Sequence, residues 1–313
     1  PGKCVLLSTS KAVRRAMKLW DISGEGGFWK VQLDIRDLGG HLDFTYRARA
    51  GTLLKRVGEA TVGVAAVGAL PLGFQVKLGL VRGKYLPAGL HAAEASYVSS
   101  SSISAFRAAI VRSVWSSKMP LANTPTILSL LDGPVDVDPA FYIVWSRFRM
   151  MRRYLAYCPE EEPRIFRMLD LISRGAQGHG PVHLLLFSAA EIGFAWDGDE
   201  KGWVRVSLPP LRMMTGPIQH FRAAILEAWH FHVFSKLSER KGFWGAEFAD
   251  LKGSLQLLNS THLSDRDKML LRAILCGGVW NGFLLGKARK EDVPCRFCGK
   301  KDGNGHLFWE CSF

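Results

Sequence analysis

The chain has 313 residues, of which 48% are hydrophobic and 22% are charged, and this composition excludes an intrinsically disordered protein. Its 41 lysine and arginine residues outnumber its 28 acidic residues, which gives a net charge of +13 and predicts a polyanionic partner, nucleic acid before an anionic membrane. The longest uncharged stretch, residues 60–76, is shorter than the ~20 residues that a membrane-spanning helix needs, so we expect no membrane span.

The first 46 residues have the pattern of short β-strands. Residues 4–7 form an apolar run, and a basic amphipathic stretch follows over residues 11–20. Over residues 31–36 hydrophobic and polar side chains alternate, which is the period of a half-buried strand. Gly39 and Gly40 come directly after this strand and predict a hairpin.

From residue 47 onward the hydrophobic period becomes helical. We expect a first helix that Pro71 ends and a second helix over residues 74–85 that Pro87 ends. A serine run then leads into a third helix over residues 103–115.

The middle of the chain is expected to be helical with long irregular joints. Asp138-Pro139 predicts the start of a helix that continues through Tyr157. Pro163 predicts the start of another helix, which Gly175 ends. Residues 178–181 are predicted to be a loop.

Two further helices are predicted towards the C-terminus. After Gly216-Pro217, hydrophobic residues between Ile218 and Leu237 fall on one face of a helix. Ser264 precedes two aspartates and resembles an N-cap with an acidic first turn, which predicts a helix over residues 266–275.

The C-terminus carries the strongest local motif, Cys295-x2-Cys298-x7-His306-x4-Cys311. Structural zinc sites take four thiolate and imidazole ligands from the protein, and a C-x2-C step lets two sulfurs reach one ion. Gly299 suits the backbone of that turn. The motif therefore predicts one structural zinc ion. The other cysteines are scattered, which favours a reducing compartment over a disulfide scaffold.

No catalytic constellation is visible. The sequence contains no adjacent Asp-Asp pair, whereas two-metal nucleotidyl transfer needs paired carboxylates. It also contains no nucleophile elbow, Walker loop or dinucleotide-binding glycine motif. We interpret the two histidine pairs, His179 with His183 and His230 with His232, as structural residues.

Two blocks of the sequence resemble the reverse transcriptase of non-LTR retrotransposons. KCVLLSTS followed by VQLDIRDLGGHLDF is similar to the end of the polymerase palm, where a lysine-bearing strand precedes the primer grip. This resemblance implies that Leu38, Gly39, Gly40 and Leu42 form a primer-grip-like element. KYLPAGLHAAEAS is similar to the segment that closes the thumb helices of the same family.

The second block is LLRAILCGGVWNGFLLGKARKEDVPCRFCGKKDGNGHLFWEC, which resembles the zinc segment that follows the polymerase in these elements. The catalytic Asp-Asp pair of the family would lie before Pro1, and its RNase H acids would lie after Phe313. We therefore interpret the chain as part of a longer Pol polyprotein that is inactive as a polymerase alone, with magnesium belonging only to the missing catalytic part.

The resemblance implies a mainly α fold with a small N-terminal β element and a small C-terminal zinc-binding module. Residues 1–46 would be the end of the palm, residues 47–118 a helical thumb, residues 119–275 a helical connection and residues 276–313 the zinc segment. The implied partners are primer–template, element RNA and target DNA, together with the rest of the polyprotein. The implied location is intracellular, in the cytoplasm and nucleus.

Phosphate contacts give affinity without sequence readout and are made by lysine and arginine. We expect these contacts from basic residues of the thumb, of the connection and of the zinc segment. The predicted residues are Arg47, Arg49, Lys55, Arg56, Lys77, Arg82, Lys84, Arg147, Arg149, Arg152, Arg153, Arg296, Lys300 and Lys301.

Two alternatives from other classes remain. The chain could be a free-standing zinc-dependent RNA-binding adaptor. It could instead be a helical protein–protein scaffold, which would be favoured if the basic residues proved dispersed and if Trp115, Trp145 and Trp229 lined an exposed groove.

Overall fold

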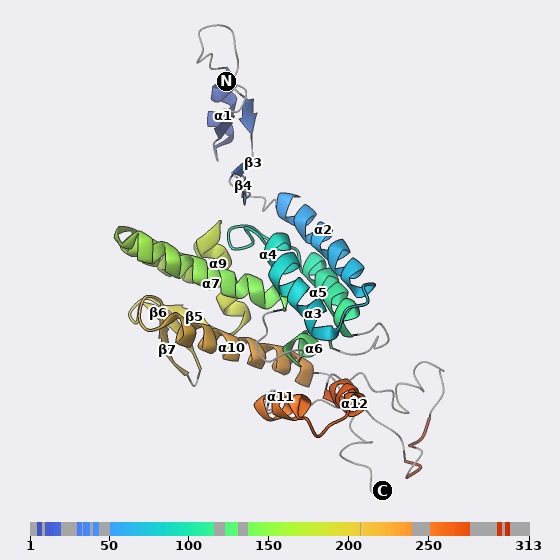
Figure 1. Cartoon of the computed structure of the whole chain (residues 1–313). Coiled ribbons are helices and arrows are strands. Elements are labelled where there is room, and N and C mark those ends of the chain that lie inside the picture. The colour runs from blue at the N-terminus through green and yellow to red at the C-terminus, as the bar shows by residue number, and fades with distance from the viewer. Residues whose placement is uncertain are drawn as a thin grey trace.

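The computed structural model describes most of the chain and shows a mainly helical protein with a small three-stranded antiparallel sheet (Figure 1). The described residues are 5–7, 10–19, 30–32, 34–37, 40–43, 51–115, 123–130, 137–206, 208–239, 251–275, 293–295 and 298–300.

The N-terminal segment contains short strands, as the alternating pattern predicted. Its elements are β1 (Val5–Leu7), α1 (Lys11–Met17), β2 (Lys30–Gln32), β3 (Asp34–Asp37) and β4 (Gly40–Asp43). β1 pairs with β2 in parallel. β3 pairs with β4 antiparallel, with Ile35 opposite Leu42. The predicted hairpin is therefore confirmed, although Leu38 and Gly39 between its strands lie outside the described residues.

A group of helices follows the hairpin. They are α2 (Gly51–Gly68), α3 (Phe74–Leu80), the π-helical turn η1 (Val81–Tyr85), α4 (Leu86–Gly89) and α5 (Ser100–Trp115). Leu53, Val57 and Val64 lie on one face of α2 and are buried, because residues three or four apart share a helix face. A Cβ atom at Gly68 would come within 3.0 Å of the Cα of Ser113, so α2 and α5 approach closely there.

The second helix does not end at Pro87 as predicted. The chain remains helical through α3, η1 and α4 to Gly89, so this boundary was wrong. Proline is tolerated in the first turn of a helix because the N–H groups there have no helical acceptor. The π-helical turn before Leu86 creates such a first turn inside a continuous helical path.

The middle of the chain combines helices with a sheet. In chain order the elements are α6 (Thr124–Leu130), α7 (Pro139–Tyr157), the 3-10 turn η2 (Pro159–Glu161), α8 (Glu162–Ser173), α9 (Pro181–Glu191), β5 (Ala195–Asp197), β6 (Gly202–Arg205), β7 (Leu208–Arg212) and α10 (Ile218–Ser238). α7 and α10 begin where Asp138 and Pro217 predicted, and Asp138 caps α7 by accepting from the N–H of Ala140.

The sheet β5–β6–β7 was not predicted. Its strands have three to five residues, too few to display a period of two, and β7 contains Pro209 and Pro210, which disfavour a strand. Tertiary packing stabilises it. Trp196 and Trp203 lie opposite each other on β5 and β6, and both are buried against the helices.

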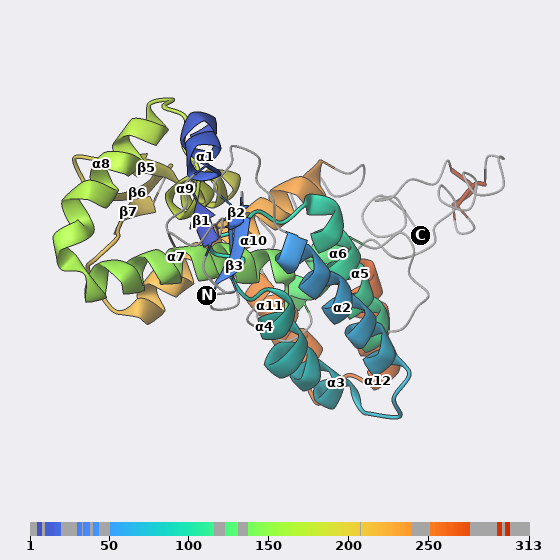
Figure 2. The same cartoon turned by 90° about the horizontal axis from the view of Figure 1, so that it is seen from above.

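Two hydrophobic cores organise the described helices. The first core lies among α2, α4, α5 and α6 and includes Leu53, Phe106 and Ile127. The second core lies among α7, α8, α9, α10 and the sheet. α7 contributes to both, with Ile143 in the first core and Phe148 in the second. Figure 2 accordingly shows α2 to α5 on one side, α8 and α9 on the other, and α7 reaching between them.

Two helices lie beyond α10, namely α11 (Leu251–Asn259) and α12 (Asp265–Leu275). Leu258 of α11 is buried in the first core. Ser264 Oγ accepts from the N–H of Asp267, so the predicted cap is confirmed. No helix in the described part of the chain is long and apolar enough to cross a membrane.

Candidate nucleic-acid interface and metal centre

A groove lies between α7 and the segment that closes the predicted thumb. Residues 87–94 form one wall, and the outward face of α7 from Tyr142 to Tyr157 forms the other. Its volume is about 400 Å³, within the range of small-ligand sites. α4 and α7 lie side by side in both Figure 1 and Figure 2.

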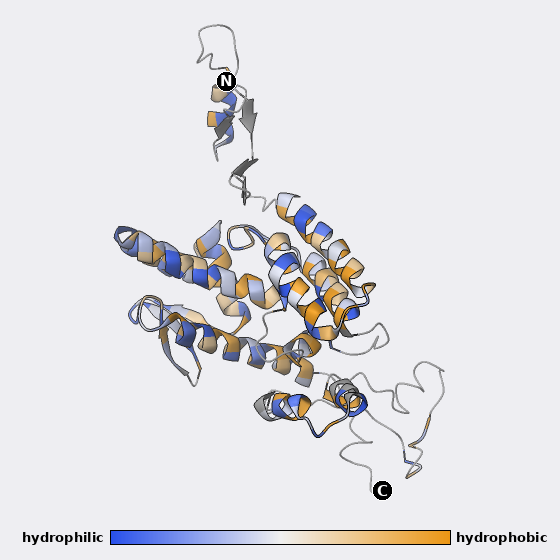
Figure 3. Cartoon of the chain, viewed as in Figure 1, coloured by the Kyte–Doolittle hydropathy of each residue, from blue (hydrophilic) through white to orange (hydrophobic). Residues whose placement is uncertain are grey.

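The groove wall on α7 follows from helical spacing. Ser146, Arg149 and Arg153 recur at three or four residues and line the groove together with Tyr142 and Tyr157. The opposite face of α7 is hydrophobic and builds the second core. In Figure 3 the ribbon of α7, at the left, carries both hydrophilic and hydrophobic residues, as a helix with one buried face does.

Arginine and tyrosine give the groove its chemistry. Arg149 and Arg153 are exposed, and the guanidinium carbon of Arg153 lies 5.9 Å from the ring centroid of Tyr157. Tyr154 and Tyr157 are 41% and 76% exposed. Glu94 is the one acidic residue in the lining of this groove. The surface thus offers cations and exposed aromatic rings together.

The opposite wall contains an unusual backbone conformation. Ala92 has φ +69, in the left-handed region that non-glycine residues seldom adopt. The neighbouring carbonyl oxygen of His91 accepts a hydrogen bond from Arg56 of α2 at 3.5 Å. Arg56, a predicted phosphate-binding residue, thus contacts the wall of the groove.

Arg147 was predicted to contact phosphate, but the structure buries it. Its residue is 6% exposed, and its guanidinium donates to Ser188 Oγ at 2.6 Å and to the carbonyl oxygens of Ser96 and Leu184. Burial lowers the pKa of Arg147 to about 10, and the charge of Glu191 opposes this shift. Because Arg147 falls on the buried side of α7, it joins helices and is not available to a phosphate.

Arg152 is also committed to internal contacts. It donates to the carbonyl oxygen of Gly216, and its guanidinium lies 4.9 Å from the ring centroid of Phe221 on α10. Burial lowers the pKa of Arg152. Of the four predicted arginines on α7, Arg149 and Arg153 therefore remain as surface cations.

The predicted phosphate-binding cations of the thumb differ in their neighbours. The Lys55 side chain is 78% exposed, with Glu59 at 3.9 Å. Arg82 and Lys84 are exposed on η1, and Lys84 Nζ lies 5.2 Å from the ring centroid of Tyr85. Arg47 and Arg49 lie outside the described residues.

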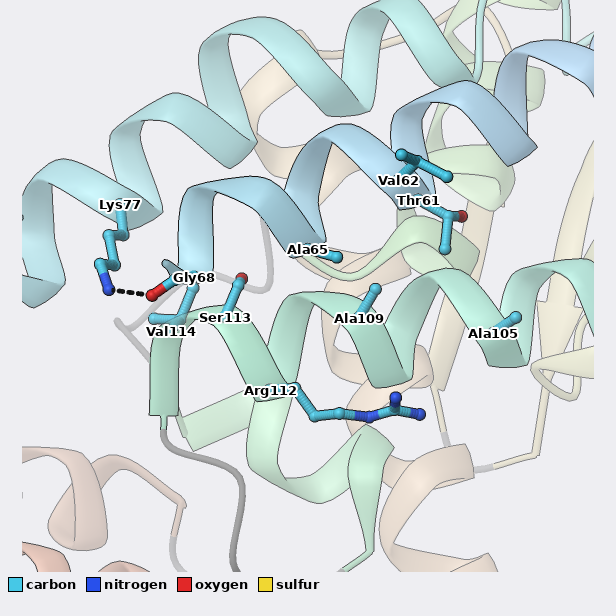
Figure 4. Close-up of a pocket in the computed structure, with 10 residues that line it drawn as sticks. All are labelled: Thr61, Val62, Ala65, Gly68, Lys77, Ala105, Ala109, Arg112, Ser113 and Val114. Carbon is cyan, nitrogen blue, oxygen red and sulfur yellow. Dashed lines mark hydrogen bonds between the residues drawn. The ribbon is translucent and has the colours of Figure 1, made fainter. Parts of the chain in front are cut away.

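A second cavity, of about 780 Å³, lies between α2 and α5 (Figure 4). Small side chains such as Ala65 and Ala109 form much of its lining. Lys77 Nζ donates to the carbonyl oxygen of Gly68 at 2.8 Å. The side chain of Arg112 extends from α5 in the direction away from Lys77. Lys77 is thus bound to the end of α2, and the cavity contains no carboxylate in its lining.

The primer-grip-like residues are described only in part. Gly40 and Leu42 lie on β4, in register with Asp37 and Ile35 of β3. Leu38 and Gly39 fall in the gap between the two strands. The primer-grip role of this hairpin stays a prediction.

Half of the predicted zinc site lies in described residues. Cys295 is buried and Cys298 half-buried. The N–H of Gly299 donates to the carbonyl oxygen of Cys295 at 2.8 Å, and the N–H of Cys295 donates to that of Lys300 at 2.8 Å. Gly299 has φ +71, a conformation that suits glycine. This closed turn fits two thiolates that share one ion.

The other half of the zinc site lies beyond the described residues. His306 and Cys311 are not among them, nor are the neighbouring cations Arg296 and Lys301. Lys300 is exposed beside the turn. No group of metal-binding side chains occurs within the described ranges, and these ranges hold only two of the four predicted ligands.

Comparison of the chain with protein families, curated proteins and solved structures found no match. The groove is lined in part by Tyr142, Tyr154 and Tyr157, which the sequence analysis did not predict as candidate binding residues. Their spacing along α7 is a signal that was present in the sequence. The same period places Arg147 beside the core residues Val144 and Phe148, which separates it from the surface arginines.

Proposed function

We propose that the chain is the part of a non-LTR retrotransposon reverse transcriptase that runs from the end of the palm through the thumb and connection to the zinc segment. In this proposal it binds primer–template, element RNA and target DNA through phosphates. The resemblance of the N-terminal hairpin, the thumb-closing segment and the C-terminal cysteine motif supports this assignment. The net charge of +13 supports the class of partner.

The observation that carries the proposal is the placement of surface cations on helices. Lys55 of α2, Arg82 and Lys84 of η1, and Arg149 and Arg153 of α7 are all exposed. α7 contains four arginines and no acidic residue. Lysine and arginine side chains on helices can contact phosphates without any contact to the bases.

The scaffold alternative lacks one of its two favouring observations, an exposed groove lined by tryptophans. Trp229 is 1% exposed in the second core, and Trp145 packs against the same core. The side chain of Trp115 lies outside the described residues. The described tryptophans therefore stabilise the fold and do not line an exposed groove.

Salt dependence of duplex binding tests the proposal. Binding of a fluorescent RNA–DNA primer–template should weaken steeply as salt rises, with little effect of base sequence, because counterions are released from the phosphates. In Lys55→Gln/Lys84→Gln, loss of two phosphate contacts should reduce the slope of log K against log salt by ~1.8.

The matched control is Arg167→Gln/Arg174→Gln, which removes two exposed charges from α8 and its C-terminal end. This variant should keep the wild-type slope. A flat salt response of the wild-type chain, or no binding at ~50 mM salt, would contradict the proposal.

A further inference from the structure

The groove between residues 87–94 and α7 has a chemistry that duplex binding does not explain. Phosphate contacts to a duplex need only cations. Here the two cations Arg149 and Arg153 stand beside the exposed rings of Tyr154 and Tyr157. In a duplex the base faces are already stacked on one another, whereas the bases of a single strand are open to aromatic side chains.

We propose that this groove binds single-stranded nucleic acid, with Arg149 and Arg153 on phosphates and Tyr154 and Tyr157 against base faces. The inference rests on the proposed function and deepens it, because it assigns an unpaired strand to one surface. Arg149 and Arg153 are four residues apart, which separates their Cα atoms by roughly 6 Å along the helix axis. Both guanidinium groups can therefore contact neighbouring phosphates of one nucleic-acid strand.

The dimensions of the groove favour a short stretch of strand. A volume of about 400 Å³ is that of a small-ligand site and suits one or two nucleotides at a time. In the wall opposite α7, the carbonyl oxygen of His91 accepts a hydrogen bond from Arg56. Tyr142, at the N-terminal end of the groove wall on α7, packs against the first core.

The exposed tyrosine rings favour a nucleic acid over an acidic peptide as the occupant. An acidic peptide would use the arginines but would leave the two exposed tyrosine rings without a matched partner. Every base has an aromatic face, and stacking on tyrosine does not depend on base sequence. The proposal therefore commits to a strand of RNA or DNA whose bases are unpaired.

The experiment compares a fluorescent ten-nucleotide oligo(U) with the RNA–DNA primer–template duplex. Tyr154→Leu/Tyr157→Leu should weaken oligo(U) binding about tenfold or more, because stacking contributes ~1–3 kcal/mol per base, and should leave duplex binding unchanged. Tyr154→Phe/Tyr157→Phe keeps both rings and should bind oligo(U) as the wild type does. Arg149→Gln/Arg153→Gln should reduce the single-strand salt slope by ~1.4.

Arg167→Gln/Arg174→Gln serves again as the control of equal charge and should change neither oligo(U) affinity nor its slope. Photocrosslinking of 5-iodouridine oligomers to the wild-type chain, with peptides mapped by mass spectrometry, gives a readout that needs no variant. Crosslinks at Tyr154 or Tyr157 are expected. Crosslinks elsewhere only, equal loss in the control, or displacement of oligo(U) by a poly-glutamate peptide would overturn the proposal.

The two proposals fail in different ways. If the chain binds the duplex with a steep salt response but oligo(U) binding ignores the Tyr→Leu changes, the groove assignment is wrong and the proposed function stands. If the chain binds neither probe, both are wrong.

Discussion

Asp138 joins parts of the molecule that are far apart in the sequence. Its carboxylate is fully buried, caps α7 at the N–H of Ala140, and accepts two hydrogen bonds of 2.7 Å from Arg107 of α5. The Arg107 guanidinium also lies 5.5 Å from the ring centroid of Trp229 on α10. One buried ion pair thus links α5, α7 and α10.

Asp138→Ala is expected to lower the free energy of unfolding by about 3 kcal/mol or more, because it leaves a largely buried arginine without its partner and also removes a helix cap. Urea unfolding followed by circular dichroism measures the change. Asp199→Ala, in the exposed turn between β5 and β6, is the control and should stay within ~0.5 kcal/mol of the wild type. A loss at Asp138 as small as that of the control would show that the ion pair does not stabilise the fold.

The two roles of Asp138 differ in how far the sequence reveals them. Asp138-Pro139 predicts a helix start because a cap involves only neighbouring residues. Its partner Arg107 is 31 positions away, and no local pattern indicates that pairing. Arg147 was predicted to bind phosphate together with Arg149 and Arg153 because all three are basic. The helical period places Arg147 on the buried face of α7 and the other two on the exposed face.

At the scale of elements, long periodic helices were predictable and short strands were not. α7 and α10 span 19 and 21 residues, so each shows several turns of its hydrophobic face. The β3–β4 hairpin was predictable because a glycine pair follows an alternating run. β5, β6 and β7 depend on Trp196 and Trp203 packing against helices distant in sequence, which a local pattern does not contain.

The C-terminal turn leads to a prediction about metal. We expect one zinc ion per chain, measured by mass spectrometry of the purified protein, and loss of the zinc in Cys298→Ser and in His306→Ala. Cys158→Ser changes a cysteine at the end of α7 and should keep the metal. Because binding and local folding are coupled in such sites, a chelator should affect this segment and spare the earlier helices.

A wild-type chain that contains no zinc would contradict this prediction and would remove one of the motifs on which the family resemblance rests. Four protein ligands would leave no open position for water. The expected role of the ion is therefore structural, and zinc removal should change the fold of residues near Cys295 without any accompanying loss of a zinc-dependent reaction.

For the whole molecule, stability should decrease in mild acid. Burial lowers the pKa of His230 and of His232 on α10 to about 4, and the charge of Lys236 adds to the shift at His232. The folded state keeps both imidazoles neutral, while the unfolded chain takes up protons below pH ~6.5. The contribution of these two histidines to the free energy of unfolding should therefore have its full value above pH ~6.5 and fall as the pH approaches 4.

Urea unfolding at several pH values measures this dependence. His230→Gln/His232→Gln should flatten the decrease between pH 6.5 and 4, whereas His220→Gln, at an exposed position of the same helix, should retain it. An unchanged slope in the double variant would show that other groups control the acid response.

The sharing of α7 between two cores has a mechanical consequence. Rotation of α2–α5 against α8–α10 would have to withdraw Ile143 from the first core or Phe148 from the second, and would also break the pair of Arg107 with Asp138. The two groups of helices are therefore expected to move as one rigid body. A strand held in the groove of α7 would then transmit tension to both groups at once, because the surface that grips it belongs to the helix they have in common.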